Sequence, residues 1–329
     1  MVKTVYLETG STDPRYNLAF EEYILTHRRE GDYLILWQNA NSVIVGRNQI
    51  SAQEVNREFA ETHGISVVRR ITGGGAVYHD LGNLNYSFIC DADDMEKRTA
   101  TRFTQPVVAA LQGLGLDAEA SGRNDILVSG CKVSGTASHI NRGRVLHHGT
   151  LLFDSDAETI TQVLTPDPLK LQAKGIRSVK SRVGNIRSFL SEDITLTQFW
   201  DYLKTALSGN GYAQGLVTEE EKQTILQLKA EKYDTWQWNY GSAPNFQLRC
   251  KDRWDGGILE IHLSVEHGKI AAIQIFGDFM ALTSCEELEK ALIGCSYQKD
   301  AISHAMAHIP LKDCLGSITK EEFLQTILK

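Results

Sequence analysis

The stretch RRITGGGAVYHD (Arg69–Asp80) joins a β-rich run to three consecutive glycines, with two arginines shortly before them. Glycines have no side chain to keep a ligand away from the backbone, so their N–H groups can close around an anionic group while the arginines supply positive charge. The stretch is not a P-loop, because no lysine and hydroxyl residue follow the last glycine. It predicts a nucleotide pocket, with a tight turn between strands as the alternative.

Three further blocks follow along the chain: GRND at Gly122–Asp125, KVSGTA at Lys132–Ala137 and HHGTLL at His147–Leu152. Together with the glycine stretch, they make the chain similar to the lipoate-protein ligase family. NLAFEEYIL (Asn17–Leu25) resembles the first helix of that family, and KGIRSVKSRVGNI (Lys174–Ile186) resembles its adenylate-binding loop. The resemblance covers most of residues 1–190. The overall length is similar to that of the bacterial form with a small C-terminal accessory domain.

The resemblance implies roles for individual residues. Lys132 is the expected catalytic residue, because one ammonium can neutralise both a carboxylate and an α-phosphate and hold these two anions together. The residues expected to bind ATP are Arg70, Gly75, Ala76, Val77, Tyr78 and Lys132, and those expected to bind lipoate are Gly74, Gly75, His79, Lys132, Ser134, Gly135 and His148. Arg69 is expected either to be structural or to contact pyrophosphate.

Two other groups of residues receive expected roles from the resemblance. The adenylate-loop residues Lys174, Arg177, Ser178 and Arg182 are expected to close over the adenylate as a lid that shields the labile anhydride from water. A solvated basic loop is the alternative for this segment. Asp125, which follows Asn124, is the candidate ligand for Mg²⁺ bridging the phosphates, since this cation binds oxygen ligands and takes few of them from the protein.

The reaction implied by the resemblance follows from the low reactivity of a carboxylate, which cannot acylate an amine at neutral pH until it becomes a mixed anhydride. The chain is therefore expected to be an ATP-dependent lipoate-protein ligase. It would form lipoyl-AMP with release of pyrophosphate and pass the lipoyl group to a lysine of an acceptor protein. The implied acceptors are apo lipoyl domains of E2 subunits of 2-oxoacid dehydrogenase complexes, or the glycine cleavage H protein. Octanoate is the alternative acyl substrate.

Composition is consistent with this interpretation. The chain has 329 residues, 42% of them hydrophobic and 23% charged, which suffices for a sizeable core and two domains. Its formal charge of −7 argues against a general nucleic-acid binder. Six scattered cysteines without a C-x-x-C pair favour reduced thiols. No apolar run is long enough for a membrane span or a signal peptide, so we expect a cytoplasmic protein without a membrane partner.

The pattern of short β-branched runs predicts an α+β (mixed α/β) fold like that of biotin and lipoate ligases. Strands are expected at Tyr33–Trp37, Ser42–Gly46, Ile65–Arg70, Leu84–Ile89, Asp125–Gly130 and Leu146–Phe153, with helices over Ser51–Thr62 and Thr99–Leu114. Short links between strands favour a mostly antiparallel sheet. The turn-rich segment before Pro244 predicts a boundary between a catalytic domain (1–243) and an accessory domain (244–329).

The accessory domain is expected to be a small α+β module. Its predicted strands are Phe246–Cys250, Gly257–Val265 and Lys269–Phe276, and His267-Gly268 should join the last two as a hairpin. Its predicted helices are Ser284–Leu292, Asp300–His308 and Thr319–Leu328.

Three patterns resemble functional motifs, but other interpretations of them are favoured. Gly113, Gly115 and Ala118 follow a helix, so a helix C-cap is favoured over a dinucleotide fingerprint. His304 and His308 have metal-ligand spacing but lack the glutamate of a metalloprotease. Cys131 is expected to point away from the site if Lys132 points into it, because neighbours on a strand face opposite sides.

Two other functions remain as alternatives. An ATP-independent octanoyl or lipoyl transferase would need a cysteine in the loop before the lysine strand, and the region GLDAEASGRNDI contains none. Biotin ligases share the architecture but use a GRGR-type nucleotide loop, which is absent. The other alternative is a non-catalytic lipoate binder. The presence of Lys132, Arg70 and the lid sequence argues against it.

Overall fold

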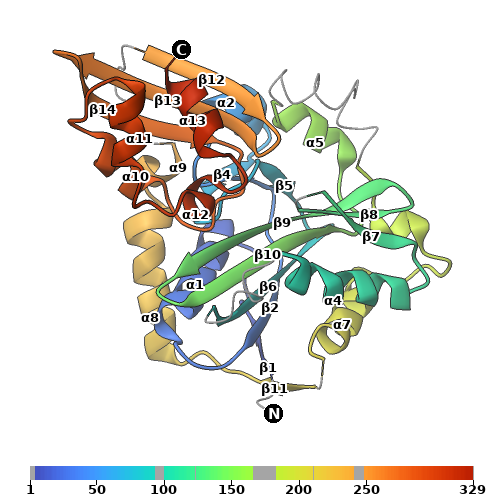
Figure 1. Cartoon of the computed structure of the whole chain (residues 1–329). Helices are drawn as coiled ribbons and strands as arrows, with labels where there is room; N and C mark the ends of the chain where they lie inside the picture. The colour runs from blue at the N-terminus through green and yellow to red at the C-terminus, as the bar shows by residue number, and fades with distance from the viewer. Residues whose placement is uncertain are drawn as a thin grey trace.

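The computed structural model describes residues 4–92, 100–122, 124–165, 183–209, 211–240 and 248–328. Its centre is an eight-stranded sheet (Figure 1). In spatial order the strands are β11 (Tyr212–Gln214), β1 (Thr4–Glu8), β2 (Tyr33–Trp37), β6 (Asn83–Asp91), β10 (Arg144–Leu152), β9 (Cys131–Asn141), β8 (Asp125–Val128) and β7 (Ala118–Ser121). β1 is parallel to β2 and β11, and all other neighbours are antiparallel. The prediction of a mostly antiparallel sheet is confirmed.

Side chains alternate between the two faces of this sheet, and each face is covered by helices. On one face, α4 (Ala100–Gly113) and α7 (Leu196–Ala206) pack with Leu84, Tyr86 and other strand residues in one hydrophobic cluster. On the opposite face, α1 (Pro14–His27) and α8 (Glu219–Leu228) pack with Ile35 and Ile89 in another. The period of two along β2 and β6 explains why consecutive residues belong to different clusters.

A second, three-stranded sheet lies beside the first and carries the glycine stretch. Its central strand β3 (Ser42–Val45) is parallel to β4 (Ser66–Arg69) and antiparallel to β5 (Val77–His79). The glycines therefore connect the end of β4 to the start of β5. α2 (Ser51–Glu54), α3 (Arg57–Thr62) and α5 (Ala157–Val163) lie around this sheet, and residues of α3 and α5 share one hydrophobic cluster with it.

The prediction of one continuous helix over Ser51–Thr62 is wrong. The chain is extended at Val55 (φ −127°, ψ 129°), where this buried side chain belongs to the core of the small sheet and its backbone bridges to Leu164. Asn56 then begins a new helix, because its side chain accepts a hydrogen bond from the Phe59 N–H at 3.1 Å. Tertiary burial of one valine and a local cap thus divide the segment in two.

The C-terminal part forms its own sheet and hydrophobic cluster. β12 (Leu248–Trp254), β13 (Gly257–Glu266) and β14 (Lys269–Gly277) are antiparallel neighbours. The predicted β13–β14 hairpin is confirmed, with His267 and Gly268 both at positive φ. The helices α10 (Glu286–Leu292), α11 (Lys299–Ala305), α12 (Leu311–Leu315) and α13 (Lys320–Ile327) accompany this sheet (Figure 1). The predicted boundary at residue 244 lies outside the described residues.

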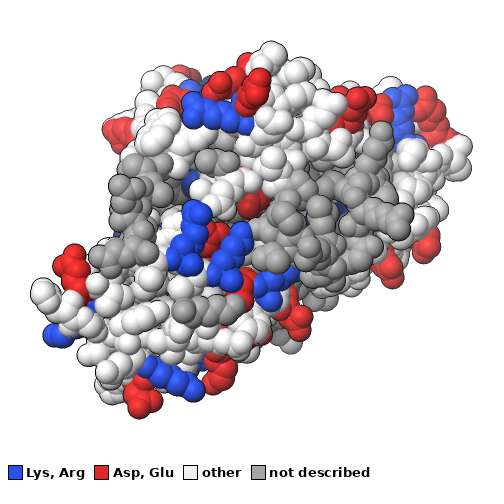
Figure 2. Space-filling model, turned by 90° about the horizontal axis from the view of Figure 1, so that it is seen from above, with Lys and Arg blue, Asp and Glu red and all other residues white. Residues whose placement is uncertain are grey.

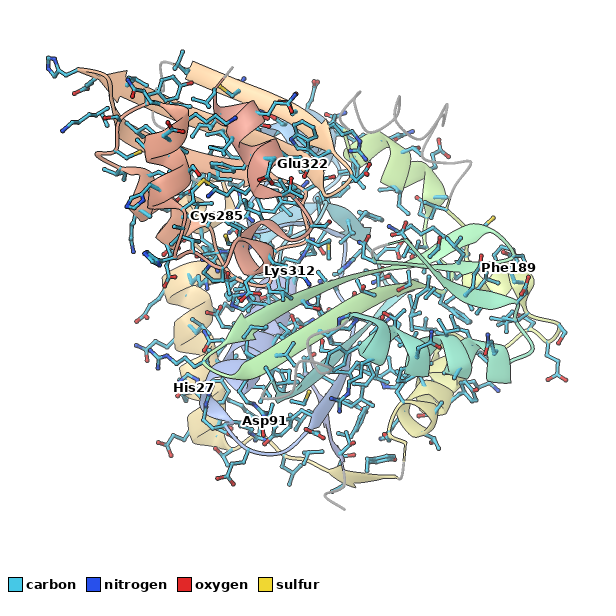
Figure 3. All side chains as sticks on the ribbon, in the orientation of Figure 1. His27, Asp91, Phe189, Cys285, Lys312 and Glu322 are labelled. Atoms are coloured by element: carbon cyan, nitrogen blue, oxygen red, sulfur yellow. The ribbon has the colours of Figure 1, made fainter. Side chains whose placement is uncertain are left out.

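Two of the remaining helices begin at capping boxes that did not enter the prediction of helices from the sequence. α7 and α8 each begin with a capping box, formed by Thr195 with Gln198 and by Thr218 with Glu221. Lys229–Tyr233 (η4), Trp236–Asn239 (α9) and Ile186–Phe189 (η3) are short helical turns. Side chains fill the layers between sheets and helices, from Phe189 at one end to His27 at the other (Figure 3).

The surface carries both signs of charge. Seen from above, basic side chains gather near the middle of one face and acidic ones lie mainly around its edge (Figure 2). None of the helices in the described part of the chain combines the length and apolar character needed to cross a bilayer.

Candidate functional site

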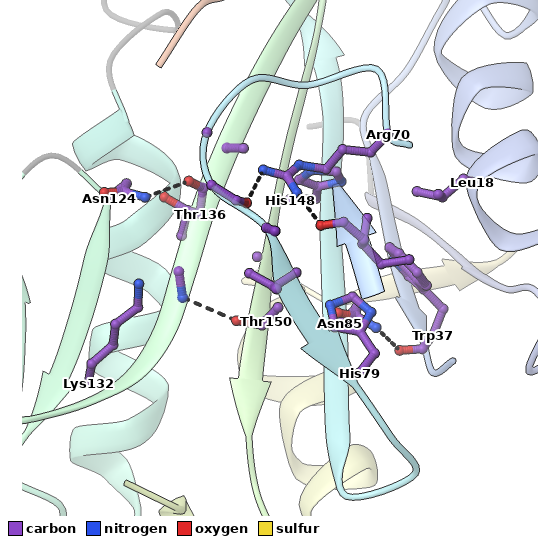
Figure 4. Close-up of a pocket in the computed structure, with 18 residues that line it drawn as sticks. Leu18, Trp37, Arg70, His79, Asn85, Asn124, Lys132, Thr136, His148 and Thr150 are labelled. Carbon is purple, nitrogen blue, oxygen red and sulfur yellow. Dashed lines mark hydrogen bonds between the residues drawn. The ribbon is translucent and has the colours of Figure 1, made fainter. Parts of the chain in front are cut away.

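A pocket lies between the glycine loop, β9, β10 and the ends of β2 and β6 (Figure 4). Of the residues predicted for the site, those that line it are Arg70, Gly74, Gly75, Ala76, Val77, His79, Lys132, Gly135 and His148. The lining also includes Leu18, Trp37, Ile44, Asn85, Asn124, Thr136, Ala137, Gly149 and Thr150, of which only Asn124 was singled out from the sequence. One pocket therefore brings together most of the predicted residues from segments far apart in the chain.

Lys132 reaches this pocket because β9 contains a bulge. Leu127 pairs with Lys132 and Ile126 pairs with Ser134, so Val133 is the extra residue on β9. The Lys132 ammonium lies 2.7 Å from a carboxylate oxygen of Asp125 and is about a quarter exposed. A single cation is thus held by one acidic partner at the mouth of the pocket.

Gly135, three residues after Lys132, leaves room for the Lys132 ammonium. A Cβ atom placed on Gly135 would stand 3.1 Å from the Lys132 Nζ atom. Cys131 does not line the pocket, and Gly184 lies against its Cβ atom instead. Ser134 is fully buried on the opposite face of the sheet, beside Tyr86, because the bulge shifts the alternation of side chains.

Arg70 holds the glycine loop through hydrogen bonds from its guanidinium group. Its guanidinium donates to the Thr72 hydroxyl at 2.8 Å and to the carbonyls of Ile44, Gly73 and Gly75 at 3.0, 2.6 and 2.9 Å. Burial lowers the pKa of this guanidinium to about 10. Three of its five N–H groups hold the loop and a fourth ties it to β3, so one N–H has no hydrogen-bond partner among the described residues.

Arg69 is engaged in a different way. It donates to the carbonyls of Gly46, Arg47 and Gln49 at 2.8, 2.9 and 2.6 Å, and to the Ser51 hydroxyl at 2.8 Å. Burial is the main reason why its pKa is lowered to about 10. Of the two roles expected for Arg69, these contacts support the structural one.

Tyr78 and His79 leave β5 in opposite directions. The Tyr78 ring is buried in the hydrophobic cluster of the small sheet and does not line the pocket. His79 lines the pocket, and its Nδ1 atom lies 3.0 Å from the side-chain amide of Asn39. Burial, followed by the charge of Arg70, lowers the pKa of His79 to about 3, so the ring is neutral. Its Nε2 atom has no hydrogen-bond partner among the described residues.

A buried carboxylate on α1 stands behind the pocket wall. Glu21 is 1% exposed and lies 2.9 Å from His148 Nδ1, while His148 Nε2 lies 2.8 Å from the Thr72 hydroxyl. Glu21 was not among the residues predicted for the site, although it belongs to the NLAFEEYIL block. The only indication in the sequence was the position of an acidic residue on an otherwise apolar helix face.

The C-terminal part contacts the glycine loop directly. The Gly74 N–H donates to the Phe279 carbonyl at 3.3 Å, and a Cβ atom on Gly74 would stand 3.1 Å from the Met280 sulfur. The Ile140 N–H donates to the Leu282 carbonyl at 2.8 Å. The segment from Phe279 to Leu282 therefore packs against both the loop and β9.

Of the predicted lid residues and the predicted metal ligand, only the metal ligand lies in the described part of the chain. The lid residues outside it are Lys174, Arg177, Ser178 and Arg182. Asp125 pairs with Lys132 and is not itself among the residues that line the pocket. Within the described part of the chain, no three His, Cys, Asp or Glu side chains gather as a metal-binding group.

Comparison with known proteins shows the family of the chain. The sequence profile of the lipoyl protein ligase A/B catalytic domain matches residues 13–208, and that of the bacterial lipoate protein ligase C-terminus matches residues 243–327. The chain is 42% identical to lipoate-protein ligase LplJ of Bacillus subtilis, over 96% of this chain and 97% of that protein. It is 40% identical to lipoate–protein ligase 1 of Staphylococcus aureus, over 95% and 96%. The chain belongs to the lipoate-protein ligase family, and it is an enzyme of the ligase class.

Solved structures resemble the chain as well. A lipoate-protein ligase A bound with ATP is 30% identical, with a TM-score of 0.62 over 73% of this chain and 98% of that one. A bipartite lipoate protein ligase of Thermoplasma acidophilum, studied with its E2 lipoyl domain, is 31% identical, with a TM-score of 0.64 over 75% and 99%. P. falciparum LipL1 in complex with lipoate shares the fold, with a TM-score of 0.80 and 24% identity over 99% and 98%.

Proposed function

We propose that this protein activates lipoate with ATP to form lipoyl-AMP and pyrophosphate, and then transfers the lipoyl group to a lysine of an apo lipoyl domain. The observation that carries the proposal is that Lys132 lines the same pocket as Arg70 and the loop glycines Gly74 and Gly75. Lipoate is bound in a structure that shares this fold, and ATP is bound in a structure of a family member. Both ligands could meet at Lys132.

In the first step, a lipoate carboxylate oxygen attacks the α-phosphorus of ATP, the bond to the β-phosphate breaks, and pyrophosphate leaves. Two anions must approach each other, and the Lys132 ammonium lowers that electrostatic cost by contacting both. The glycine loop can bring backbone N–H groups to the phosphates because Gly74 adopts φ +88° and has no side chain. Lys132 and the loop thus act by charge and position.

In the second step, the neutral amine of the acceptor lysine attacks the lipoyl carbonyl, an amide bond forms, and AMP leaves with the electrons of the broken C–O bond. Negative charge develops on the carbonyl oxygen, and fixed donors around it stabilise the transition state. Lys132 and the remaining guanidinium N–H of Arg70 are donors that line the pocket.

The acyl chain would occupy the apolar side of the same pocket. Leu18, Trp37, Ile44, Val77 and Ala137 provide apolar walls there. Each methylene buried in such an environment stabilises binding by about 0.8 kcal/mol. Lipoate and octanoate have carbon chains of the same length, so they differ in the dithiolane ring alone. We propose lipoate as the substrate and octanoate as the competitor to compare.

Mg²⁺ is proposed as the companion of ATP. Asp125 would hold it, together with phosphate and water oxygens, because this cation commonly takes only one or two carboxylates from a nucleotide-binding protein. Among the described residues, Asp125 is the acidic side chain paired with Lys132, which fits a site with few protein ligands. The ion would neutralise charge on the phosphates.

The other parts of the proposal concern segments around the pocket. We propose that Lys174, Arg177, Ser178 and Arg182 close over the adenylate, as the resemblance of their segment implies. We also propose a catalytic domain over residues 1–243 and an accessory domain over 244–329. The acceptor is proposed to be an E2 lipoyl domain, since a relative was studied with one, or the H protein. These substrates fit the cytoplasmic location expected from the sequence.

An acyl transferase that works through a cysteine thioester is less well supported. No cysteine lines the pocket among the described residues. Cys90 is buried in another cluster, and Cys131 faces Gly184. A thioester mechanism would therefore have no described cysteine nucleophile in the pocket.

The proposal is tested by incubating the protein with lipoate and MgATP without an acceptor, and by measuring pyrophosphate release and bound lipoyl-AMP. Lys132→Ala should lose both, while Lys222→Ala, which removes a half-exposed lysine of α8, should keep both. Addition of an apo lipoyl domain to the wild type should then give a lipoylated lysine. Absence of adenylate with the wild type would refute the ligase reaction. Full activity of Lys132→Ala would refute the role of this residue.

A further inference from the structure

A continuous chain of buried hydrogen bonds runs behind the pocket from its acyl side to the glycine loop. The Trp37 indole N–H donates to the Ser87 hydroxyl at 2.8 Å, and the Ser87 hydroxyl donates to Glu21 at 2.5 Å. Glu21 lies 2.9 and 3.0 Å, through its two carboxylate oxygens, from His148 Nδ1. His148 Nε2 lies 2.8 Å from the Thr72 hydroxyl, to which Arg70 Nε also donates at 2.8 Å.

The donors and acceptors of this chain can be assigned at every link. The Thr72 oxygen accepts from the Arg70 guanidinium, so its own hydrogen is available to donate to His148 Nε2. With Nε2 as acceptor, the His148 ring carries its hydrogen on Nδ1 and donates it to the Glu21 carboxylate. Hydrogen bonds are then donated toward Glu21 from both ends of the chain. Thr72 is the only described side chain that connects the histidine to the arginine.

The chain has both ends in the pocket and its middle behind the wall. Trp37, His148 and Arg70 line the pocket, whereas Glu21, Ser87 and Thr72 are 1%, 0% and 0% exposed. Arg70 in turn holds the carbonyls of Gly73 and Gly75, which fix the shape of the glycine loop. A ligand that presses on Trp37 or His148, which both line the pocket (Figure 4), therefore contacts groups tied to the loop through Thr72.

We infer that Thr72 is a positioning residue that couples occupancy of the acyl side of the pocket to the geometry of the glycine loop, so that lipoate and ATP strengthen each other's binding. This inference rests on the proposed function, because it needs both ligands to bind in the one pocket. Buried hydrogen-bond networks hold their members in discrete arrangements, which is the property that coupling requires. The coupling must be reciprocal: each ligand raises the affinity for the other by the same factor.

The test measures this factor at equilibrium. Lipoate and α,β-methylene-ATP are titrated calorimetrically, each alone and each in the presence of the other, with Mg²⁺ throughout. The methylene bridge replaces the bond that adenylation breaks, so no adenylate forms during the titration. For the wild type we expect lipoate to tighten binding of the analogue about fivefold or more, within the usual range of coupling.

Two substitutions at Thr72 separate positioning from packing. Thr72→Val keeps the shape but removes both hydrogen bonds, and it should bring the coupling factor close to one while lipoate alone still binds. Thr72→Ser keeps the hydroxyl and should retain the coupling. Thr224→Val, on an exposed part of α8, is the matched control and should behave as the wild type. If Thr72→Val does not fold, Glu21→Leu, which removes both acceptor oxygens, interrupts the same chain at its centre and should likewise reduce the coupling.

The outcomes distinguish this inference from the proposed function. If the wild type binds neither ligand, the proposed function fails and the inference fails with it. If the wild type binds both ligands without coupling, or if Thr72→Val couples them as strongly as the wild type does, the inference is overturned while the ligase reaction stands. Loss of coupling in Thr72→Val together with its retention in Thr72→Ser supports the inference.

Discussion

Lowering the pH from about 7.5 to about 5.5 should destabilise the protein through three histidines that the fold keeps neutral. His79, His139 and His147 are 3%, 8% and 0% exposed. Burial, the largest cause in each case, lowers their pKa values to about 3, about 4 and about 3. Unfolded histidine has a pKa of about 6.5. Between these values the unfolded state binds protons that the folded state does not, so the free energy of unfolding decreases as the pH falls.

The magnitude follows from the difference between the folded and unfolded pKa values. The contribution of each histidine is fully present above pH 6.5 and is lost as the pH falls toward its folded pKa. At about pH 5.5, one such histidine lowers the free energy of unfolding by about 1.4 kcal/mol relative to about pH 7.5, because this pH lies one unit below the unfolded pKa. The three together should lower it by about 4 kcal/mol.

The assay is urea unfolding followed by tryptophan fluorescence at both pH values, for the wild type and for His147→Phe. A phenyl ring can keep the stacking of His147 on Phe103, whose ring centroid lies 4.9 Å away. This variant should lose about 1.4 kcal/mol less than the wild type over the same pH interval. His63→Phe, which changes an exposed histidine, is the control and should lose as much as the wild type. An equal loss in His147→Phe and the wild type would refute the reasoning.

Three further substitutions probe the site itself. Gly135→Ala places a Cβ atom 3.1 Å from Lys132 Nζ, so adenylation should fall about tenfold to a hundredfold with an unchanged melting temperature; unchanged adenylation would show that the ammonium position is not critical. Gly46→Ala places its Cβ atom 2.0 Å from the Gly74 carbonyl oxygen, and thermal unfolding should reveal a loss of about 1–3 kcal/mol or more together with weaker nucleotide binding. A stable Gly46→Ala variant would contradict the packing at the loop. Asp125→Asn should raise the Mg²⁺ concentration for half-maximal pyrophosphate release about tenfold, and an unchanged Mg²⁺ dependence would exclude Asp125 as the ligand.

The glycine loop could be recognised from the sequence because its signal is local, whereas Lys132 was identified through the resemblance to the lipoate-protein ligase family. Consecutive glycines permit a backbone conformation that other residues resist, and Gly74 does adopt positive φ. The strands were predictable from runs of β-branched residues, and β2 has the bounds that were expected, Tyr33–Trp37. Such features depend on neighbours within a few residues, so no knowledge of the tertiary fold was needed.

Other parts of the site depended on contacts between distant segments. The bulge at Val133 decides that Lys132 and Gly135 share the pocket face while Ser134 turns to the opposite side. Strict alternation along a strand cannot foresee an extra residue, because the bulge arises from the pairing of β9 with β8. For the same reason, the expected role of Ser134 in binding lipoate is not supported by its position.

By itself, the sequence determined the family to which the chain belongs and the places of several strands, such as β2. Only the tertiary structure decided that Glu21 reaches His148 across 127 positions of the chain, and that Phe279 meets the glycine loop. The reason is physical: local periodicity reports what each segment can bury, whereas the partner of a buried polar group is set by the packing of whole elements.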